Sequence, residues 1–295
     1  MRRGSRSLFI VAFLSPAILL YGGFVVYPLI QAFQLSLYRW RGVSQNRKFV
    51  GAENYQKLIH DDVFWKALQH NLWLLVVGGI CIFVLGLLIA SAMQKDSRLV
   101  RATRAVVLFP QVISLVVVAI LWMFMYNPSF GLLNATLNGV HLSGWAHAWL
   151  GESKTALPAV TVAFLWYAIG FYVMLFGAGM KGISEEVNEA AELDGSHGFH
   201  KFRTITWPLL WSVKRVAAVY VVVNVMNVFA LVFLMTQGGP DRHTEVMLTY
   251  LYEQAFSNNQ FGYAAALAVA NFIVAMLLSF GILAWMRRDP QAARS

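Results

Sequence analysis

Six long apolar runs alternate with polar segments along the chain, and each run is long enough for a membrane-spanning helix. A span through the hydrocarbon of a bilayer needs about 20 consecutive, mostly apolar residues. We predict spans at residues 8–36, 70–93, 105–126, 156–179, 216–236 and 263–286. Because the runs are spread evenly, the pattern predicts an all-α, polytopic membrane protein with a single transmembrane domain over residues 1–295.

The polar segment 181–210 lies between the fourth and fifth runs and is rich in helix-forming residues. Ser184 is the predicted N-cap of a short helix, which would end at Gly195, because glycine enters the left-handed region without strain. This helix is expected to have a small apolar side made of Val187, Ala190, Ala191 and Leu193. On helical pattern alone, the segment fits a solvated loop and a docking surface equally well.

A second short helix is expected in the same segment. It would start at Ser196 and end before Pro208, since the residue before a proline disfavours helical geometry. Its predicted buried residues are Phe199, Phe202 and Ile205.

The composition agrees with a membrane protein, since 58% of the residues are hydrophobic and only 13% are charged. The net charge of +9 does not indicate nucleic-acid binding, because the Lys and Arg residues gather at the edges of the apolar runs. Cys81 is the only cysteine and lies inside a run, so an intrachain disulfide is excluded and inert packing is expected.

Lysine and arginine positions predict the orientation of the chain. With the N-terminus in the cytoplasm, the inner segments hold fifteen of these residues and the outer segments eight, which favours cytoplasmic N- and C-termini. Six of the eight outer residues fall in one loop, 37–69, which departs from the rule. The inner set is Arg2, Arg3, Arg6, Lys95, Arg98, Arg101, Arg104, Lys181, Lys201, Arg203, Lys214, Arg215, Arg287, Arg288 and Arg294.

No catalytic or metal-binding constellation emerges from the sequence. The predicted spans hold no Asp, Glu, Lys or Arg, which argues against a pump driven by protons or sodium. The chain has no GxxxxGK[ST] phosphate loop, and no histidine is spaced with cysteine or acidic residues as a metal set. An external source of energy is therefore expected.

The segment around Glu189 resembles a known signature. Glu189-Ala190-Ala191, Asp194-Gly195, Phe202, Ile205 and Pro208 match the EAA motif of the membrane subunits of bacterial ABC importers, with departures at Ser196 and Trp207. Residues 49–55, 127–134 and 236–240 extend the resemblance to the maltose-type, carbohydrate-uptake branch.

The resemblance implies a permease subunit in the bacterial inner membrane. Its expected partners are a homologous second permease, two ATP-binding subunits, an extracytoplasmic solute-binding protein, a sugar substrate and the lipid bilayer, with no nucleic acid. ATP and Mg²⁺ would be bound by the partner ATPase, and this chain would hold no cofactor. The residues that the resemblance assigns to coupling with the ATPase are Glu189, Ala190, Ala191, Asp194 and Gly195.

The resemblance also implies a substrate path. Ungapped counting from the motif places it on the fourth and fifth spans, where Val221, Val225 and Val228 stand at positions that are polar in the family. The polar groups Gln111 and Asn224 fit either this path or ordinary interhelical hydrogen bonding. The implied path residues are Gln111, Leu115, Phe164, Tyr167, Ala168, Phe171, Asn224 and Val228.

Three alternatives stay open at this stage. The same kind of importer could carry a glycerol phosphodiester or a polyol. An intramembrane enzyme would need clustered ionisable residues or metal ligands within the spans, and the sequence shows none. A scaffold subunit would leave Gln111, Asn224 and the segment around Glu189 without a role.

Overall fold

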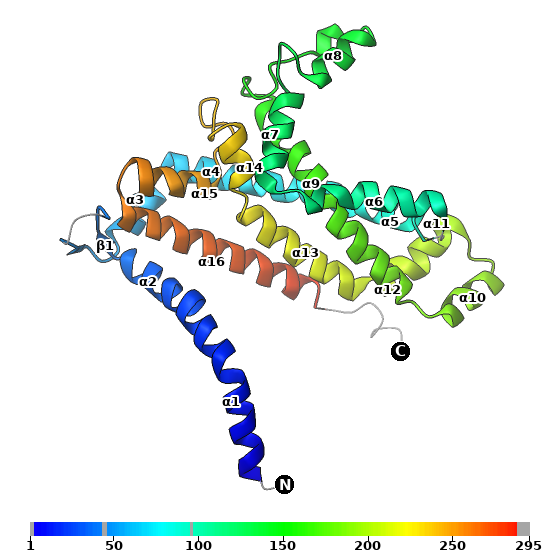
Figure 1. Ribbon diagram of the computed structural model, residues 1–295, viewed down its shortest axis with the longest axis horizontal. Coiled ribbons are helices and arrows are strands. Elements are labelled where there is room, and N and C mark those ends of the chain that lie inside the picture. Colours follow the sequence, from blue (N-terminus) through cyan, green and yellow to red (C-terminus); the bar gives the residue numbers. More distant parts are fainter. Residues whose placement is uncertain (1–2, 43–45, 95–96, 288–295) are drawn as a thin grey trace. The chain divides into compact units, whose positions relative to one another are not determined.

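The computed structural model describes residues 3–42, 46–94 and 97–287, and most of this chain is helical (Figure 1). Within these residues, five helices are long and apolar enough to cross a membrane, or six if the bent pair α6 and α7 counts as one span. The all-α, polytopic prediction is confirmed. Two groups of elements are each compact: residues up to 61 with 251–273, and residues 62–250 with those from 274 onward.

The first group begins with a continuous helical stretch and a small hairpin. Asn54 is buried and donates to the backbone carbonyls of Ser36 (2.7 Å) and Tyr38 (3.0 Å), which holds the hairpin to the helix that follows it. Strands β1 and β2 are antiparallel, with Tyr38 opposite Phe49. The elements are α1 (Arg3–Tyr21), a π turn (Gly22–Val26), α2 (Tyr27–Leu35), β1 (Tyr38–Arg39), β2 (Lys48–Phe49), α3 (Glu53–Ile59), a second π turn (Glu253–Ser257) and the beginning of α16 (Phe261–Trp285).

The first apolar run does not end at either of its prolines. Pro16 lies inside α1, and Pro28 is the second residue of α2, which follows the π turn Gly22–Val26. A proline lacks the N–H of the regular ladder and its ring crowds the carbonyl four residues earlier. The wider π turn before Pro28 relieves this conflict, because its hydrogen bonds skip one more residue. The helix therefore continues to Leu35.

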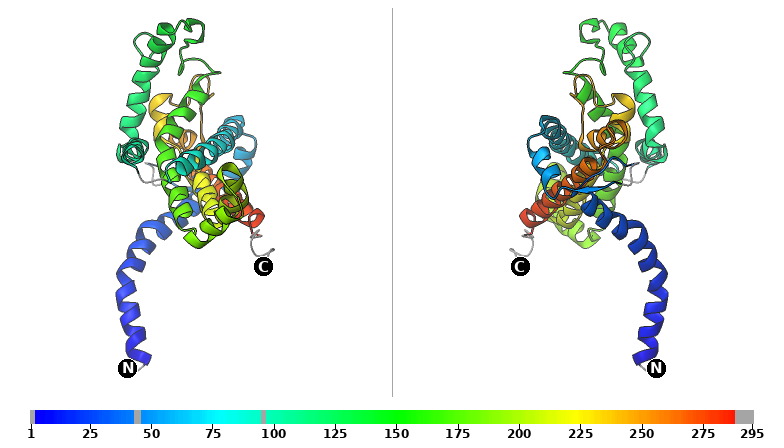
Figure 2. Two further views of the ribbon diagram at one scale, coloured as in Figure 1. Left: turned by 90° about the vertical axis from the view of Figure 1, so that its right-hand side faces the viewer. Right: turned by 90° about the vertical axis from the view of Figure 1, so that its left-hand side faces the viewer.

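The second group is organised around α9 (Ala156–Lys181), which packs against α5, α6, α7, α13 and α14 (Figure 2). Tyr172 and Phe176 are among its fully buried residues. The other elements are α4 (Asp62–Trp73), a π turn (Leu74–Gly78), α5 (Gly79–Ala92), α6 (Arg98–Val112), α7 (Leu115–Met125), α8 (Leu132–Gly139), a 3₁₀ turn (Ser143–Trp145), α10 (Glu185–Leu193), α11 (Gly198–Lys201), a π turn (Phe202–Thr206), α12 (Trp207–Leu209), α13 (Trp211–Met226), α14 (Ala230–Met235) and α15 (Met247–Tyr252).

The predicted span 105–126 is divided into two helices. The axes of α6 and α7 meet at 104°, and Ile113 and Ser114 between them have extended backbone conformations. Pro110 weakens the last turn of α6, because it cannot donate to the helical ladder. Gly170 of α9 lies against the α6 backbone, where an added Cβ would approach the carbonyl oxygen of Val107 to 2.5 Å. This close approach fixes α6 against α9.

Charged residues extend into the ends of the long helices. Helix α13 begins at Trp211, so that Lys214 lies in its first turns, and the Lys214 ammonium donates to the carbonyl of Trp207 (2.7 Å) and covers the Trp207 ring (3.7 Å). The expected inner-segment residues Arg2, Lys95, Arg288 and Arg294 lie outside the described residues. The orientation of the chain therefore remains a prediction from charge.

Asn71 of α4 connects to α13 and α15, a role that the sequence pattern does not predict. It is fully buried, its amide donates to the carbonyl of Val225 (2.8 Å), and its side-chain oxygen accepts from the Met247 N–H (2.9 Å). Replacing Asn71 with Ala is expected to lower the free energy of unfolding by about 1–3 kcal/mol, because a buried donor and acceptor lose their partner. Thermal unfolding in detergent measures this.

Asn227→Ala is the matched control for the Asn71 variant. Asn227 is exposed and its amide donates to Val223, in its own helix. Its replacement should change stability by about 0.5 kcal/mol or less. Equal losses in both variants would show that the Asn71 bridge does not stabilise the fold.

Candidate functional site

Helix α10 is closed at its C-terminal end by a Schellman motif. Gly195 has φ +73°, the Ser196 N–H donates to the Ala191 carbonyl (2.8 Å), and the Gly195 N–H donates to the Glu192 carbonyl (3.0 Å). These two bonds satisfy carbonyls that a helix end otherwise leaves unpaired. The predicted stop at Gly195 is confirmed. Ser184 occupies the N-cap position, but its side chain makes no capping hydrogen bond.

The second helix of this segment differs from the prediction at both ends. Helix α11 starts at Gly198, two residues after Ser196, and the chain stays helical through Pro208. The π turn Phe202–Thr206 precedes Pro208 and accommodates the missing N–H, as the turn before Pro28 does. Phe199 is 77% exposed, so its predicted burial was wrong, whereas Phe202 and Ile205 are half-buried.

One face of helix α10 packs against its own chain, and the opposite face is exposed. Ala191 is 3% exposed, whereas Leu193 is 90% exposed and Glu189 and Ala190 are also exposed. Residues four apart lie on the same side of a helix, so Glu189 and Leu193 share the outward face. The predicted apolar side is therefore divided: only Ala191 faces inward, and Leu193 does not pack on this chain.

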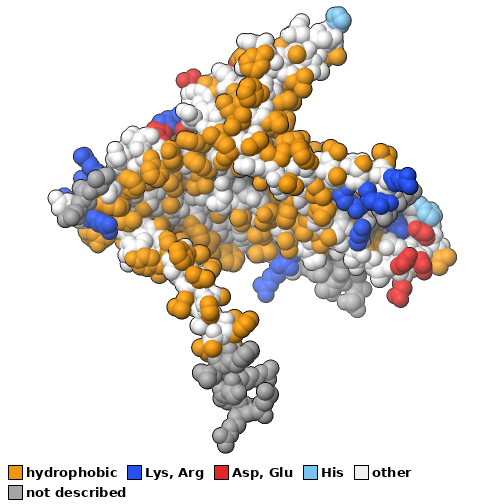
Figure 3. All heavy atoms as spheres, in the orientation of Figure 1, with side chains coloured by type: hydrophobic (Ala, Val, Ile, Leu, Met, Phe, Trp, Pro, Cys, Tyr) orange, Lys and Arg blue, Asp and Glu red, His pale blue; other side chains and the backbone are white. Residues whose placement is uncertain are grey.

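A lysine holds the two short helices together. Lys201 donates to the Glu192 carboxylate (3.1 Å) and to the Asn188 carbonyl (3.4 Å), which joins α11 to α10. Ser196 is buried between them, and its hydroxyl has no hydrogen-bond partner within the described part of the chain. The space-filling view shows acidic side chains at the α10 end of the molecule beside a separate group of Lys and Arg (Figure 3). The outward face of α10 is therefore acidic and apolar.

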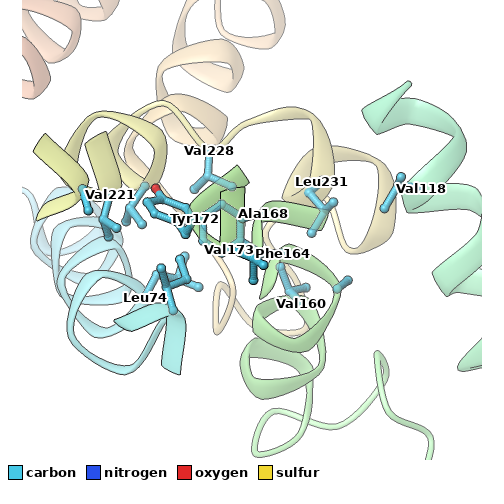
Figure 4. Close-up of a cluster of buried hydrophobic side chains, with 14 of the residues drawn as sticks. Leu74, Val118, Val160, Phe164, Ala168, Tyr172, Val173, Val221, Val228 and Leu231 are labelled. Atoms are coloured by element: carbon cyan, nitrogen blue, oxygen red, sulfur yellow. The ribbon is translucent and has the colours of Figure 1, made fainter. Parts of the chain in front are cut away.

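The residues expected along the path fall into two sets. Phe164, Ala168 and Val228 are at most 6% exposed and belong to one packed apolar cluster, together with Val221 and Tyr172 (Figure 4). Leu115, Tyr167, Phe171 and Asn224 are half-buried. In this conformation the first set is closed by side-chain packing, so a solute would reach it only after the helices separate.

Gln111 binds backbone rather than open space. Its amide donates to the carbonyls of Tyr167 (2.6 Å) and Ala168 (3.3 Å) on α9. Both acceptors belong to positions that the resemblance assigns to the path. These two hydrogen bonds favour an interhelical role for Gln111, because its N–H groups link α6 to α9.

Asn224 lies at an aromatic cluster, of which the sequence predicted only some members. Its amide donates to the Tyr172 hydroxyl (3.3 Å), and the rings of Phe171 and Tyr220 lie 4.5 Å apart beside it. Tyr220 was missed, although it stands four residues before Asn224 and so shares its helix face. An amide beside aromatic faces is the kind of surface that binds sugar hydroxyls and rings.

The described residues contain no group of three or more His, Cys, Asp or Glu that could hold a metal ion. They do contain many exposed apolar side chains on helices of spanning length, such as Phe24 at 79% and Trp285 at 84%. Exposed apolar surface of this extent is stable only in lipid or against a partner. The fold and the projecting α10 define a polytopic integral membrane protein.

Comparison with known proteins identifies the family. Residues 82–289 match the family described as binding-protein-dependent transport system inner membrane component, and the chain belongs to it. The chain is 36% identical to a probable ABC transporter permease protein (YurN) of Bacillus subtilis, covering 90% of this chain and 92% of that protein. It is 34% identical to the diacetylchitobiose uptake system permease protein (NgcF) of Streptomyces coelicolor, covering 95% and 82%.

The fold matches a solved structure over nearly its whole length. A crystal structure of a bacterial ABC transporter involved in the import of the acidic polysaccharide alginate aligns with a TM-score of 0.83. The alignment covers 97% of both chains, at 22% sequence identity. The expected membrane-subunit fold is therefore confirmed.

Proposed function

We propose that this chain is a permease subunit of an ATP-driven, binding-protein-dependent importer for a sugar or oligosaccharide. The observation that carries the proposal is the exposed face of α10, which presents Glu189 and Leu193 away from its own chain. A projecting helix that exposes a carboxylate, and an apolar residue that does not pack on its own chain, is suited to insert into a cleft of another protein. The uptake of diacetylchitobiose and alginate by similar proteins supports a saccharide as the solute.

The proposed assembly holds a homologous second permease, two ATP-binding subunits and an extracytoplasmic solute-binding protein. Helix α10 docks on an ATP-binding subunit, which binds ATP and Mg²⁺, and this chain acts as a transporter rather than an enzyme. Both termini and α10 lie in the cytoplasm under this proposal, in accord with the lysine and arginine bias. Closure of the ATP-binding subunits would move α10 and, through α9 and α13, open the packed path.

In the proposed path, Asn224 and the rings of Phe171 and Tyr220 meet the solute first, because they are accessible while Phe164, Ala168 and Val228 are packed. The apolar residues would line the passage after the helices separate. Gln111 and Leu115 would border it, with Gln111 holding the α9 backbone at Tyr167 and Ala168.

Replacing Asn224 with Leu is expected to weaken transport about 5- to 150-fold, because a solute hydroxyl loses its amide partner at a cost of about 1–3 kcal/mol. Complex assembly and unstimulated ATP hydrolysis should stay near normal. Uptake by the reconstituted importer measures the loss.

Tyr172→Phe is the control that separates the two roles of Asn224. It removes the same interhelical hydrogen bond and leaves the Asn224 amide in place. Transport near wild type in Tyr172→Phe, together with a loss in Asn224→Leu, supports the path. Equal defects in both variants would assign Asn224 to helix packing alone.

Uptake by the reconstituted importer from a panel of solutes tests the proposed function. The panel contains mono- and oligosaccharides, an acidic oligosaccharide, a polyol and a glycerol phosphodiester. ATP-dependent accumulation of a saccharide is the expected result. Accumulation of the glycerol phosphodiester alone would contradict the saccharide assignment, and the absence of ATP-dependent uptake of every solute would contradict the importer.

A further inference from the structure

A cavity opens between the C-terminal parts of α5 and α9 and the first half of α6. Its volume is 200 Å³. The cavity is lined by two cationic side chains, one amide and several apolar residues. Among the residues that the structure describes, no acidic side chain lines it. They are Ala90, Met93, Gln94, Arg104, Val173, Met174, Gly177, Ala178 and Lys181.

Two cations reach this cavity from different helices. Arg104 of α6 is half-buried, and its guanidinium donates to the Met93 carbonyl (3.2 Å) at the end of α5. This bond uses one of the five N–H groups of an arginine and fixes the side chain in place. Lys181 is the last residue of α9 and is exposed. An anion between them would receive donors from both.

The amide of Gln94 is already satisfied within the cavity wall. It donates to the Ala90 carbonyl (2.9 Å) and to the Met180 sulfur (3.2 Å). The remaining walls are apolar or backbone, and at Gly177 an added Cβ would meet no atom within 4 Å. The cavity therefore has a basic rim and an empty apolar floor.

Along helix α6, basic residues in the first turns give way to exposed apolar residues in the later turns. Arg98, Arg101 and Arg104 occupy its first two turns, and Val106, Phe109 and Val112 on its later turns are 60–85% exposed. A helix that is basic at one end and exposes apolar side chains at the other matches the change from headgroups to hydrocarbon in a bilayer. The cavity lies beside the basic end.

We propose that this cavity binds the headgroup of an anionic phospholipid. The phosphodiester lies between Arg104 and Lys181, the glycerol lies over Gly177, and the acyl chains extend from the apolar floor into the hydrocarbon of the bilayer. Anionic lipids are attracted to Lys and Arg residues at membrane interfaces. A free phosphate would meet the same two cations, but it would leave the apolar floor uncovered.

The position of the site gives the lipid a structural role. Lys181 ends α9, and α10 starts four residues later at Glu185. A lipid held by Arg104 and Lys181 braces α6 against the end of α9 that leads into α10. The site is thus suited to stiffen the base of the projecting helix, whichever solute the importer carries.

Thermal unfolding of the full chain in a neutral detergent tests this proposal. Dioleoyl-phosphatidylglycerol is titrated against dioleoyl-phosphatidylcholine, which has the same acyl chains, and against inorganic phosphate. The expected result is a larger rise in melting temperature with phosphatidylglycerol than with either of the others. The double variant Arg104→Gln/Lys181→Gln should weaken the apparent affinity for phosphatidylglycerol about 30-fold.

Two further variants keep the test decisive. Lys66→Gln/Lys154→Gln removes two exposed lysines that do not line the cavity and should retain the full phosphatidylglycerol effect. Gly177→Leu fills the floor while Arg104 and Lys181 both stay in the chain, and it should lose that effect even if the double variant does not fold. An unchanged phosphatidylglycerol effect in Gly177→Leu, or an equal effect of inorganic phosphate, would overturn the proposal.

Discussion

Replacing Glu189 with Lys is expected to abolish transport while the amount of the protein in the membrane stays normal. Glu189 is exposed on the outward face of α10, so folding of this chain should not depend on the Glu189 side chain. At the proposed contact, the carboxylate meets a basic group or backbone donors of the ATP-binding subunit. Reversing the charge places like charges together, which costs about 3 kcal/mol and weakens docking about 100-fold. Uptake and binding-protein-stimulated ATP hydrolysis measure the effect.

Glu189→Gln is the matched control for this variant. It keeps the size and the hydrogen-bonding oxygen but removes the charge, so a partial loss between wild type and Glu189→Lys is expected. Wild-type transport in Glu189→Lys would show that α10 does not transmit the energy of ATP hydrolysis. A lower amount of Glu189→Lys in the membrane would show that Glu189 serves the fold instead.

The second large effect is expected at Gly195. Its φ of +73° is strained for a β-branched residue, although an added Cβ would meet no neighbouring atom. Gly195→Val should therefore cost about 1–3 kcal/mol locally and open the Schellman motif that positions α11 against α10. We expect normal membrane insertion, because the segment lies outside the spans, together with loss of transport.

Gly195→Asn separates backbone conformation from side-chain size. Asparagine adopts the left-handed region more readily than other residues with a Cβ. Transport close to wild type is therefore expected in Gly195→Asn, although its side chain is as bulky as that of valine. A loss in Gly195→Asn equal to that in Gly195→Val would show that the space at this position matters rather than φ.

The sequence predicted the end of α10 but not which of its residues are buried. Gly195 follows from local chemistry, because few residues accept a positive φ. The apolar pattern that joined Ala191 to Leu193 does not distinguish packing on the same chain from packing on a partner. Ala191 is buried and Leu193 is 90% exposed, so the pattern combined an internal contact with an outward surface.

Backbone irregularities account for the other differences. Pro208 predicted a helix end, but the π turn before it removes the conflict, and sequence pattern does not reveal π turns. The break at Ile113 and Ser114 likewise lies in an apolar run, three residues after the proline at position 110, and the run is long enough for one continuous span. Asn71 stands at the polar start of an apolar run, where its two long-range hydrogen bonds depend on tertiary structure.

Three of the residues proposed for the path could be placed together from the sequence, but their packed arrangement could not be predicted. Counting from the motif brought Phe164, Ala168 and Val228 into one region, which the structure shows as a packed cluster. Spacing along the chain fixes which residues are neighbours. It does not fix whether the helices that carry them are together or apart.

Photocrosslinking from Leu193 in the assembled importer tests the central claim most directly. Benzoylphenylalanine at position 193 replaces Leu193, which is 90% exposed on the same face of α10 as Glu189, and the same residue at Leu142, which is 49% exposed, serves as the control. The account predicts an adduct between position 193 and the ATP-binding subunit, and none from position 142. Adducts from position 142 to that subunit, with none from position 193, would contradict it.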